Sequence, residues 1–213
     1  QNLYVINVLF DPAQLGIPLA DLGSLPGYHA LFTVEPRVRR QQKFNNRLRL
    51  SMEQLSHAVK LIAEAEEELE HRKRGYRFAA TTHLMRLIGY LSRCYSELEM
   101  DETRPVTQIS ELLGYMERHY AEPLSVEDLM QVANMSQTTL MRKFKEIMRR
   151  TPIDYLIRLR ITKARELLRR SKMSITDVAF EVGFSDSNYF ARQFRKVAGV
   201  SPREYRQRMR VSR

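Results

Sequence analysis

The stretch Ser174–Tyr205, which reads SITDVAFEVGFSDSNYFARQFRKVAGVSPREY, decides the fold of this chain because its pattern occurs twice. The other copy is Ser125–Tyr155, SVEDLMQVANMSQTTLMRKFKEIMRRTPIDY. The first parts of the two copies align at an offset of 49 residues and the later parts at 50, so the second copy carries one extra residue in its central turn. Each copy has the pattern of two helices joined by a tight turn. The sequence therefore predicts two helix-turn-helix units, at residues 125–148 and 174–198.

Capping signals mark where the helices of each copy begin. Ser125 and Ser174 are each followed three residues later by an aspartate, which is a short-carboxylate form of the capping box. The second helix of each unit is expected over Gln137–Met148 and Ser187–Ala198. Thr151-Pro152 then predicts the start of a long helix, because a hydroxyl N-cap followed by proline is typical of a first helical turn. At about 19 residues, this helix is roughly 28 Å long and can hold the two units apart at a fixed angle.

The outward-facing residues of the two second helices suit contact with DNA. An α-helix fits the major groove, where arginine pairs well with guanine and asparagine with adenine. In the first copy the outward residues are Thr138, Thr139, Met141, Arg142 and Lys145, and in the second they are Ser187, Asn188, Arg192, Arg195 and Lys196. We expect Lys145, Arg195 and Lys196 to contact phosphates, because they come later in the helices, and the others to face base edges. The alternative is that all of them are ordinary solvated helix residues.

Positive charge is concentrated in the duplicated half. The net charge of the chain is +10, and residues 106–213 hold 21 Lys and Arg against 12 Asp and Glu, a net of +9. This asymmetry favours a polyanionic partner, and together with the repeated motif it indicates double-stranded DNA. A basic surface retained for solubility is the alternative.

The first fifty residues predict two short strands separated by a loop. Leu3–Phe10 (LYVINVLF) and Tyr28–Val34 are rich in β-branched, aliphatic and aromatic residues, which favours strands. Glycine and proline are frequent between them. Two strands are too few to make a stable sheet alone. We therefore expect residues 1–50 to be the tail of a larger domain and the chain to be a fragment.

Two long amphipathic helices follow, at about Ser51–Arg72 and Arg77–Leu98, so residues 51–98 predict a helical hairpin. The first helix carries an acidic side and an apolar stripe of Leu55, Val59, Ile62, Ala65 and Leu69. The stripes must be buried against a missing domain, the other helix or a second copy of the chain, and we favour self-association. Residues 99–106 are polar and aperiodic and predict a linker to a domain at 107–213.

Two segments of the duplicated half resemble a known family. Ile175–Pro202 (ITDVAFEVGFSDSNYFARQFRKVAGVSP) is close to the signature of the AraC/XylS family of bacterial transcription regulators, and Arg158–Leu168 (RLRITKARELL) resembles that family's linker helix. The resemblance covers about residues 107–210. It implies a mainly α, seven-helix double helix-turn-helix domain with two recognition helices in successive major grooves of promoter DNA. It also implies a sequence-specific regulator, often an activator of metabolic genes such as those for sugar use, that works with RNA polymerase.

By position, the resemblance also implies which side chains read bases. Thr138, Met141 and Arg142 match base-reading places in the first unit, although Met141 replaces the polar residue expected there. In the second unit the matching residues are Asp186, Ser187, Asn188 and Arg192. Asp186 enters the candidate site through this resemblance alone.

The first hundred residues resemble the region that follows the cupin-like sensor barrel in many of these regulators, where a helical hairpin often dimerises. This resemblance implies a homodimer formed through residues 51–98 and a short β remnant of the sensor domain at residues 1–50. It also implies a small-molecule effector that binds in the part of the sensor which the chain lacks. The expected chain is thus mainly α, with a β remnant and a hairpin before the DNA-binding domain.

Other classes of function find little support in the sequence. The five histidines lack metal-ligand spacing, and there is no glycine-rich phosphate loop or nucleophile elbow, so we expect no enzyme, no metal and no cofactor. Cys94 lies in an apolar helical pattern, which favours a buried thiol in a reducing compartment. No apolar run is long enough to span a membrane and no signal peptide is visible, so a cytoplasmic protein is expected. The main alternative to a sequence-specific regulator is a non-specific architectural DNA-binding protein, which needs only the positive face.

Overall fold

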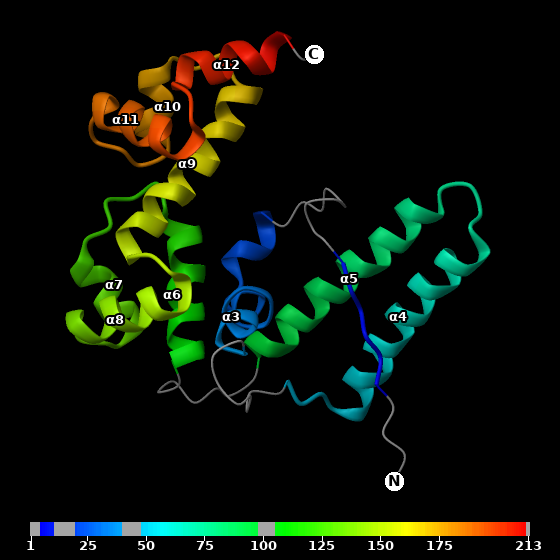
Figure 1. Cartoon of the computed structure of the whole chain (residues 1–213). Coiled ribbons are helices and arrows are strands. Elements are labelled where there is room, and N and C mark those ends of the chain that lie inside the picture. The colour runs from blue at the N-terminus through cyan, green and yellow to red at the C-terminus, as the bar shows by residue number, and fades with distance from the viewer. Residues whose placement is uncertain (1–4, 11–19, 40–47, 98–104, 212–213) are drawn as a thin grey trace.

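The computed structural model of the chain describes residues 5–10, 20–39, 48–97 and 105–211 (Figure 1). Every regular element in these four stretches is helical, so the mainly α fold predicted from the sequence is confirmed. No helix in the described stretches is long and apolar enough to cross a bilayer.

The helices form three parts that lie in a row. A hairpin of α4 (Met52–His71) and α5 (Tyr76–Ser96) stands at one side, and the helices between residues 105 and 211 stand at the other (Figure 1). Between them lies a bridge segment, which we define as Ala20–Arg39. The bridge packs against both α5 and α6 (Pro105–His119). It therefore joins the hairpin to the C-terminal helices, although it precedes both in the sequence.

Neither of the two strands predicted in the first fifty residues is present among the described residues. Val5–Phe10, the described part of the first, has no regular secondary structure, and Leu3 and Tyr4 lie outside the described residues. The second, Tyr28–Val34, is helical. A strand needs a neighbour to take its backbone hydrogen bonds, and the described stretches offer none. The prediction of a β remnant is therefore wrong for these residues.

The bridge segment consists of a short 3-10 turn, Leu25 and then a continuous helical run. It comprises η1 (Ala20–Ser24), α2 (Pro26–Tyr28), the π-helical η2 (His29–Val34) and α3 (Glu35–Arg39). The N–H of Glu35 bonds to the carbonyl of Ala30, five residues back. This wider turn comes directly before Pro36, whose ring would clash with the carbonyl four residues earlier in a regular α-helix. The Glu35-Pro36 pair, which predicted the end of a strand, instead marks a change of helical register.

Small residues let the bridge segment approach its neighbours closely. A Cβ atom on Gly27 would collide with the carbonyl oxygen of Ser92, so only glycine fits where α2 crosses α5. The N–H of Gly27 also donates to Ser96 Oγ (3.0 Å). On the other side, Ala30 and Val34 are buried in the core that α6 forms with the helices after it. The bridge therefore completes a core that is otherwise formed mainly by the C-terminal helices.

Helix α4 is rotated from the orientation that its apolar stripe predicted. The residues it buries against α5 are Ala58 and Leu61. Three members of the predicted stripe are exposed instead: Leu55 by 45%, Val59 by 42% and Leu69 by 52%. These three members thus lie along the edge of the hairpin, whereas Ile62 of the same stripe packs against the hairpin core.

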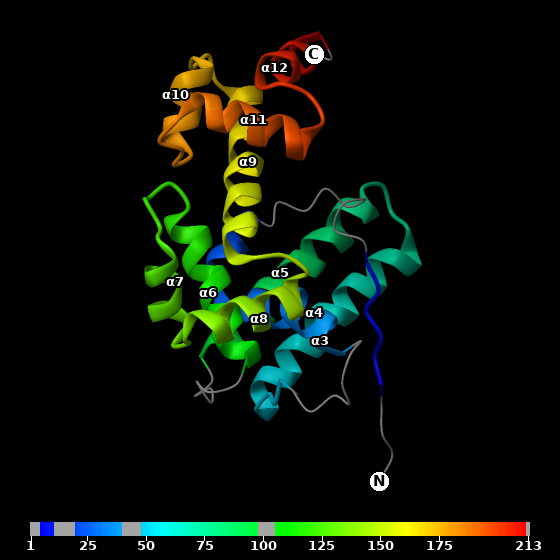
Figure 2. The same cartoon turned by 60° about the vertical axis from the view of Figure 1, so that its left-hand side comes forward.

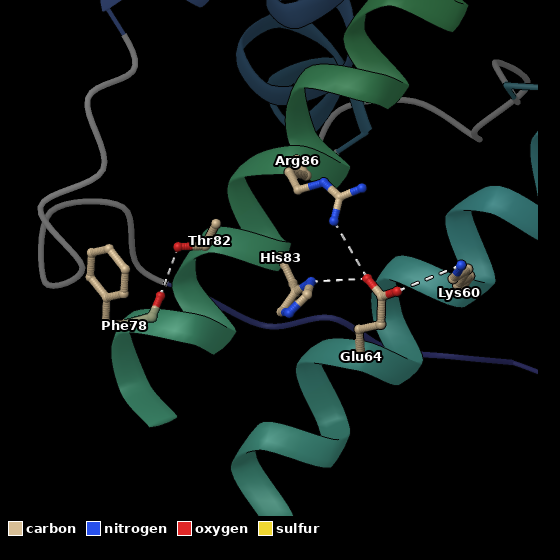
Figure 3. A network of polar contacts seen from close by, with 6 residues as sticks. All are labelled: Lys60, Glu64, Phe78, Thr82, His83 and Arg86. Atoms are coloured by element: carbon tan, nitrogen blue, oxygen red, sulfur yellow. Dashed lines mark hydrogen bonds and ion pairs between the residues drawn. The ribbon is translucent and has the colours of Figure 1, made fainter. Parts of the chain in front are cut away.

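Polar contacts between α4 and α5 explain this rotation (Figure 3). Glu64 Oε2 lies 3.0 Å from His83 Nδ1 and 3.6 Å from Arg86 Nη1, both on α5. Lys60 Nζ lies 4.0 Å from Glu64 Oε1 on the same helix. These partners turn the side of α4 that carries Glu64 towards α5, which moves the apolar stripe outwards. The acidic side of α4 thus contains one residue, Glu64, that contacts the other helix of the hairpin.

Seven helices follow one another in the C-terminal part, as the double helix-turn-helix fold requires. They are α6, α7 (Val126–Ala133), α8 (Gln137–Met148), α9 (Pro152–Arg170), α10 (Ile175–Glu181), α11 (Ser187–Ala198) and α12 (Pro202–Val211). Helix α6 begins at Pro105, so the last two residues of the predicted linker are helical. The rest of that linker, residues 99–104, lies outside the described residues.

These seven helices build two hydrophobic cores. Leu129 and Phe144 are fully buried in the first, with residues of α6, the first half of α9 and the bridge. Phe190 and Phe194 are fully buried in the second, with the later turns of α9. Tyr120, just after α6, packs against both. Each core therefore holds one recognition helix in place, and α9 belongs to both cores.

Candidate nucleic-acid interface

The first unit consists of α7, a turn and α8. Ser125 Oγ accepts a hydrogen bond from the N–H of Asp128 (3.1 Å), and Asp128 Oδ2 accepts one from the N–H of Ser125 (2.8 Å). This is the predicted capping box. Asn134 ends α7 in the left-handed region, with φ at 47°, which asparagine tolerates better than most residues. The turn then leads into α8, which buries Phe144 against α7.

The second unit consists of α10, a turn and α11, and it repeats this design. Ser174 and Asp177 form the second capping box, with hydrogen bonds of 3.0 and 3.2 Å. Gly183, with φ at 89°, takes the left-handed position that Asn134 holds in the first unit. Phe184 follows it and is buried, so the turn places one apolar side chain in the core.

The extra residue of the second copy lies at Ser185. Phe184 occupies the place of Met135, 49 residues earlier, since both donate a backbone hydrogen bond five residues back. Asp186 is the N-cap of α11, as Ser136 is the N-cap of α8, and these two are 50 residues apart. The additional residue therefore lies between Phe184, the buried apolar residue of the turn, and Asp186, the N-cap of α11.

The recognition helix of the second unit has the stronger cap. Asp186 Oδ1 accepts hydrogen bonds from the N–H groups of Tyr189 (2.9 Å) and Asn188 (2.6 Å). These two bonds, with a smaller contribution from the charge of Arg192, hold the pKa of the Asp186 carboxyl below its usual range. Ser136 makes no side-chain cap bond at α8. Asp186, which the family resemblance placed among the base-reading residues, thus has a capping role in this structure.

Helices α8 and α11 lie on one side of the molecule, towards opposite ends of α9. Figure 1 shows both on the side turned away from the hairpin, and the 60° rotation in Figure 2 brings that side forward. With 19 residues, α9 is roughly 28 Å long. The two recognition helices can therefore face one extended partner together.

The predicted site residues lie on the solvent-facing sides of these two helices. Phe144 and Phe190 occupy the opposite sides and are fully buried. The exposed residues are Thr138, Arg142, Lys145, Asp186, Asn188, Arg192, Arg195 and Lys196, and the half-buried ones are Thr139, Met141 and Ser187. In the described parts of the chain, no three His, Cys, Asp or Glu side chains gather closely enough to hold a metal ion.

Comparison with known proteins places the chain in a family. A family model described as a helix-turn-helix domain matches residues 129–208. The chain is similar to the HTH-type transcriptional activator RhaS of Enterobacter sp. (strain 638), with 36% identity over 157 residues, which are 74% of this chain and 55% of that protein. It is 45% identical over 112 residues to RhaS of Escherichia fergusonii, covering 53% of this chain and 40% of that protein. The chain therefore contains a helix-turn-helix domain of the AraC/XylS type.

Solved structures also resemble part of this AraC/XylS chain. The DNA-binding domain of AdpA, in complex with a target DNA, is 32% identical, with a TM-score of 0.48 over 50% of this chain and 96% of that one. An AraC-type transcriptional regulator from Chromobacterium violaceum is 31% identical, with a TM-score of 0.46 over 48% of this chain and 91% of that one. The chain spans about half the length of the RhaS relatives that it matches.

A joint at the corner between α6 and α7 holds the two units of this AraC/XylS domain together. Arg160 on α9 donates through Nε to Tyr120 O and through Nη2 to Glu122 O, both at 2.7 Å. Gly183 lies against the same corner, and a Cβ atom there would be 2.7 Å from Tyr120 O and 2.8 Å from Ala121 O. Nothing in the sequence pattern singles out Arg160 among the basic residues of α9. The glycine in the turn indicates a left-handed conformation but not what packs against it.

A shielded ion pair lies beside this joint. Lys163 Nζ on α9 is 3.1 Å from Glu117 Oε2 on α6, and the two side chains are only 18% and 16% exposed. The same Lys163 Nζ lies 5.4 Å from the centroid of the Tyr120 ring. Water and salt screen this pair less than a surface pair, and loss of either partner would leave the other charge shielded and unpaired between α9 and α6.

We expect Gly183→Ala to destabilise the domain more than Gly199→Ala does. Both glycines have positive φ, 89° and 78°, but a Cβ atom meets two carbonyl oxygens at Gly183 and open space at Gly199. The φ strain alone predicts a loss of about 1 kcal/mol in the free energy of unfolding for Gly199→Ala. Strain and collision together predict about 2–4 kcal/mol for Gly183→Ala. Urea unfolding followed by circular dichroism measures both, and equal losses would contradict close packing at the joint.

Proposed function

We propose that this protein is a sequence-specific DNA-binding transcription regulator that places α8 and α11 in successive major grooves on one face of a duplex. The observation that carries the proposal is the position of these two helices on one side of α9 (Figures 1 and 2). Successive major grooves on one face of B-DNA are about 34 Å apart. The 19-residue α9, at roughly 28 Å, has a length close to that repeat.

The exposed side chains divide into two roles under this proposal. Thr138, Thr139, Met141 and Arg142 on α8, and Asp186, Ser187, Asn188 and Arg192 at and after the start of α11, face the base edges. Lys145, Arg195 and Lys196, later in the same helices, face the phosphates. Asp186 is occupied in capping by its Oδ1 atom, so the second carboxylate oxygen is the one available to a base. Arginine and asparagine are the side chains best suited to guanine and adenine in the major groove.

Activation of transcription is part of the same proposal. The RhaS relatives are named transcriptional activators, which supports an activating role. Under the proposal the protein acts with RNA polymerase at promoters of metabolic genes, including genes for sugar use. Its place of action is the bacterial cytoplasm. A small-molecule effector is a further partner under this proposal, and the family resemblance of the chain supports it.

Selection of bound sequences from a random duplex pool, at near-physiological salt, tests the function directly. We expect two short conserved blocks whose centres are about 10–10.5 base pairs apart, because two recognition helices read adjacent major grooves. Strong binding without any enriched sequence would contradict sequence-specific recognition. It would support a non-specific architectural protein that uses only the positive face.

Two substitutions on α11 separate base contact from phosphate contact. Arg192→Ala should cost about 1–3 kcal/mol on the selected duplex and little on random DNA, because a base contact exists only at the correct sequence. Lys196→Ala should weaken both complexes alike and lower the slope of log affinity against log salt by about 1. Fluorescence anisotropy over a salt series measures both effects. An equal loss on both duplexes for Arg192→Ala would disprove its base-reading role.

Dimerisation through residues 51–98 is a further part of the proposal, and the exposed stripe of α4 supports it. Leu55, Val59 and Leu69 lie on one side of this helix, and Met52 extends the stripe with 79% exposure. A two-fold dimer pairs one surface with its own copy, so a single stripe is buried twice. Burial of this stripe stabilises by about 25 cal/mol for each Å² of apolar surface removed from water.

We expect Leu55→Glu to convert the dimer to monomer, because it places a charge within the paired apolar stripe. Phe180→Glu on α10 is the matched control, since Phe180 is a comparably exposed apolar residue (53%) away from the hairpin. Sedimentation equilibrium of the two variants and the parent chain measures the change. A parent chain that is monomeric at all concentrations, or a Phe180→Glu variant that dissociates equally, would contradict this interface.

A further inference from the structure

Helices α8 and α11 each carry an arginine at the equivalent position, but the neighbours of this arginine differ between the two units. Arg142 and Arg192 occupy equivalent places at an offset of 50 residues. Three residues earlier, the first unit has Thr139 and the second has Tyr189. Four residues later, the first unit has Glu146 and the second has a lysine. On a helix these are the positions whose side chains contact one another, so the two arginines are held in different ways.

In the second unit, the arginine lies over an aromatic ring. The Arg192 guanidinium carbon is 5.9 Å from the centroid of the Tyr189 ring. Tyr189 is 38% exposed, and its ring leans on buried Phe184, with centroids 6.0 Å apart. Its backbone N–H is bonded to the cap residue Asp186 at 2.9 Å. The Tyr189 ring beneath Arg192 is thus held in place by Phe184 of the turn and by the bond to the cap residue Asp186.

This contact keeps the Arg192 guanidinium near the beginning of α11. The ring lies three residues before Arg192, so the guanidinium is drawn towards the N-terminal end of the helix. The charge of Arg192 also acts on the Asp186 carboxyl, where it helps to lower the pKa. In helix-turn-helix proteins, the N-terminal residues of the recognition helix are the ones that contact base edges. The contact therefore holds the arginine at the end of the helix from which bases are read.

In the first unit, the equivalent arginine is drawn the other way. Arg142 Nη1 lies 3.9 Å from Glu146 Oε2, one turn towards the C-terminus, and the two side chains are 66% and 47% exposed. Thr139 has no ring to offer, and its hydroxyl accepts a hydrogen bond from Ser136 Oγ (3.0 Å). Such an exposed pair is weak. Even so, it must break before Arg142 can turn to a base at the start of α8.

We propose that Tyr189 is a positioning residue for Arg192, and that the second unit therefore discriminates bases more strongly than the first. The inference rests on the base-reading role proposed above and adds which residue prepares that role. An arginine that already lies in its binding position loses less conformational freedom on binding. A cation–π contact at an exposed site corresponds to about a two- to fivefold change in an equilibrium constant. The effect of Tyr189 on discrimination at the base read by Arg192 should be of this size.

The test compares Tyr189→Leu and Tyr189→Phe, each with Arg192 present and with Arg192→Ala. Affinity is measured on the selected duplex and on three further duplexes. These carry each of the other bases at the position where Arg192→Ala loses discrimination. With Arg192 present, Tyr189→Leu should lower discrimination at that base about two- to fivefold, while Tyr189→Phe, which keeps an aromatic ring, should preserve it. With Arg192→Ala, Tyr189→Leu should have no further effect on discrimination. Thermal unfolding of each variant shows that the second core is intact.

The outcomes separate this inference from the function on which it rests. If Arg192→Ala leaves discrimination unchanged at every base, the base-reading role itself is wrong. If Arg192→Ala removes discrimination but Tyr189→Leu has the same effect with and without Arg192, then Tyr189 acts by its own contact and the positioning role is overturned. Loss of discrimination in Tyr189→Phe equal to that in Tyr189→Leu would also overturn it, because the ring would then not be what matters.

The repeat supplies a converse experiment in the first unit. Thr139→Tyr with Glu146→Gln gives Arg142 a ring at the equivalent position and removes the carboxylate that draws it away. Met135, the apolar residue of the first turn, occupies the place of Phe184 and can support the new ring. We expect discrimination at the base read by Arg142 to rise about two- to fivefold, with Thr139→Ser plus Glu146→Gln as the control without a ring. An equal rise in discrimination in the control would contradict the positioning role of the ring, because the release of Arg142 from Glu146 would then account for the whole effect.

Discussion

The corner formed by residues 120–122 is the constraint on which the arrangement of the two units depends. At the end of a helix, several carbonyl oxygens have no partner within the helix, and here Arg160 donates to two in this corner. Bonds from a charged donor are stronger than those between neutral groups. Gly183 brings the turn of the second unit against the same corner. Since α9 belongs to both cores, it fixes each unit to one end of the same helix, and these contacts add a second, direct connection between the two units.

The bridge segment extends this constraint to the hairpin. Arg118 on α6 donates to Ser24 O (2.6 Å), and Arg37 on α3 contacts Met148 Sδ (2.8 Å) at the end of α8. On its other side, the bridge meets α5 at Gly27, where the backbones are too close for any side chain. The hairpin is therefore connected to the first recognition helix by packed and hydrogen-bonded groups, in addition to the chain itself. Any displacement of the hairpin must move or break contacts with the core of the first unit.

Local signals were enough to predict the C-terminal helices but not the parts whose form depends on distant contacts. Helices α8, α9 and α11 have the predicted bounds, because caps, proline at the first position and a 3.6-residue period are all local. Tyr28–Val34 has a composition that suits a strand, but the burial of Ala30 and Val34 on α6 selects a helix. The rotation of α4 depends on contacts of Glu64 with residues about twenty positions away. The hydrophobic periodicity of α4 or of α5 gives no signal for a polar contact between the two helices.

The candidate site was likewise predictable only in part, and the difference between its two units has a physical consequence. Periodicity places the site residues on the outer sides of α8 and α11, but the different surroundings of Arg142 and Arg192 become visible only with the side chains in place. Two rigidly linked units bind with an affinity beyond that of either alone, so one unit can discriminate less without loss of overall binding. Two equal units would fit a site in either order when its two blocks are alike. Unequal units favour one order, which fixes the direction of the chain on the duplex and hence the surface it presents to a neighbouring protein.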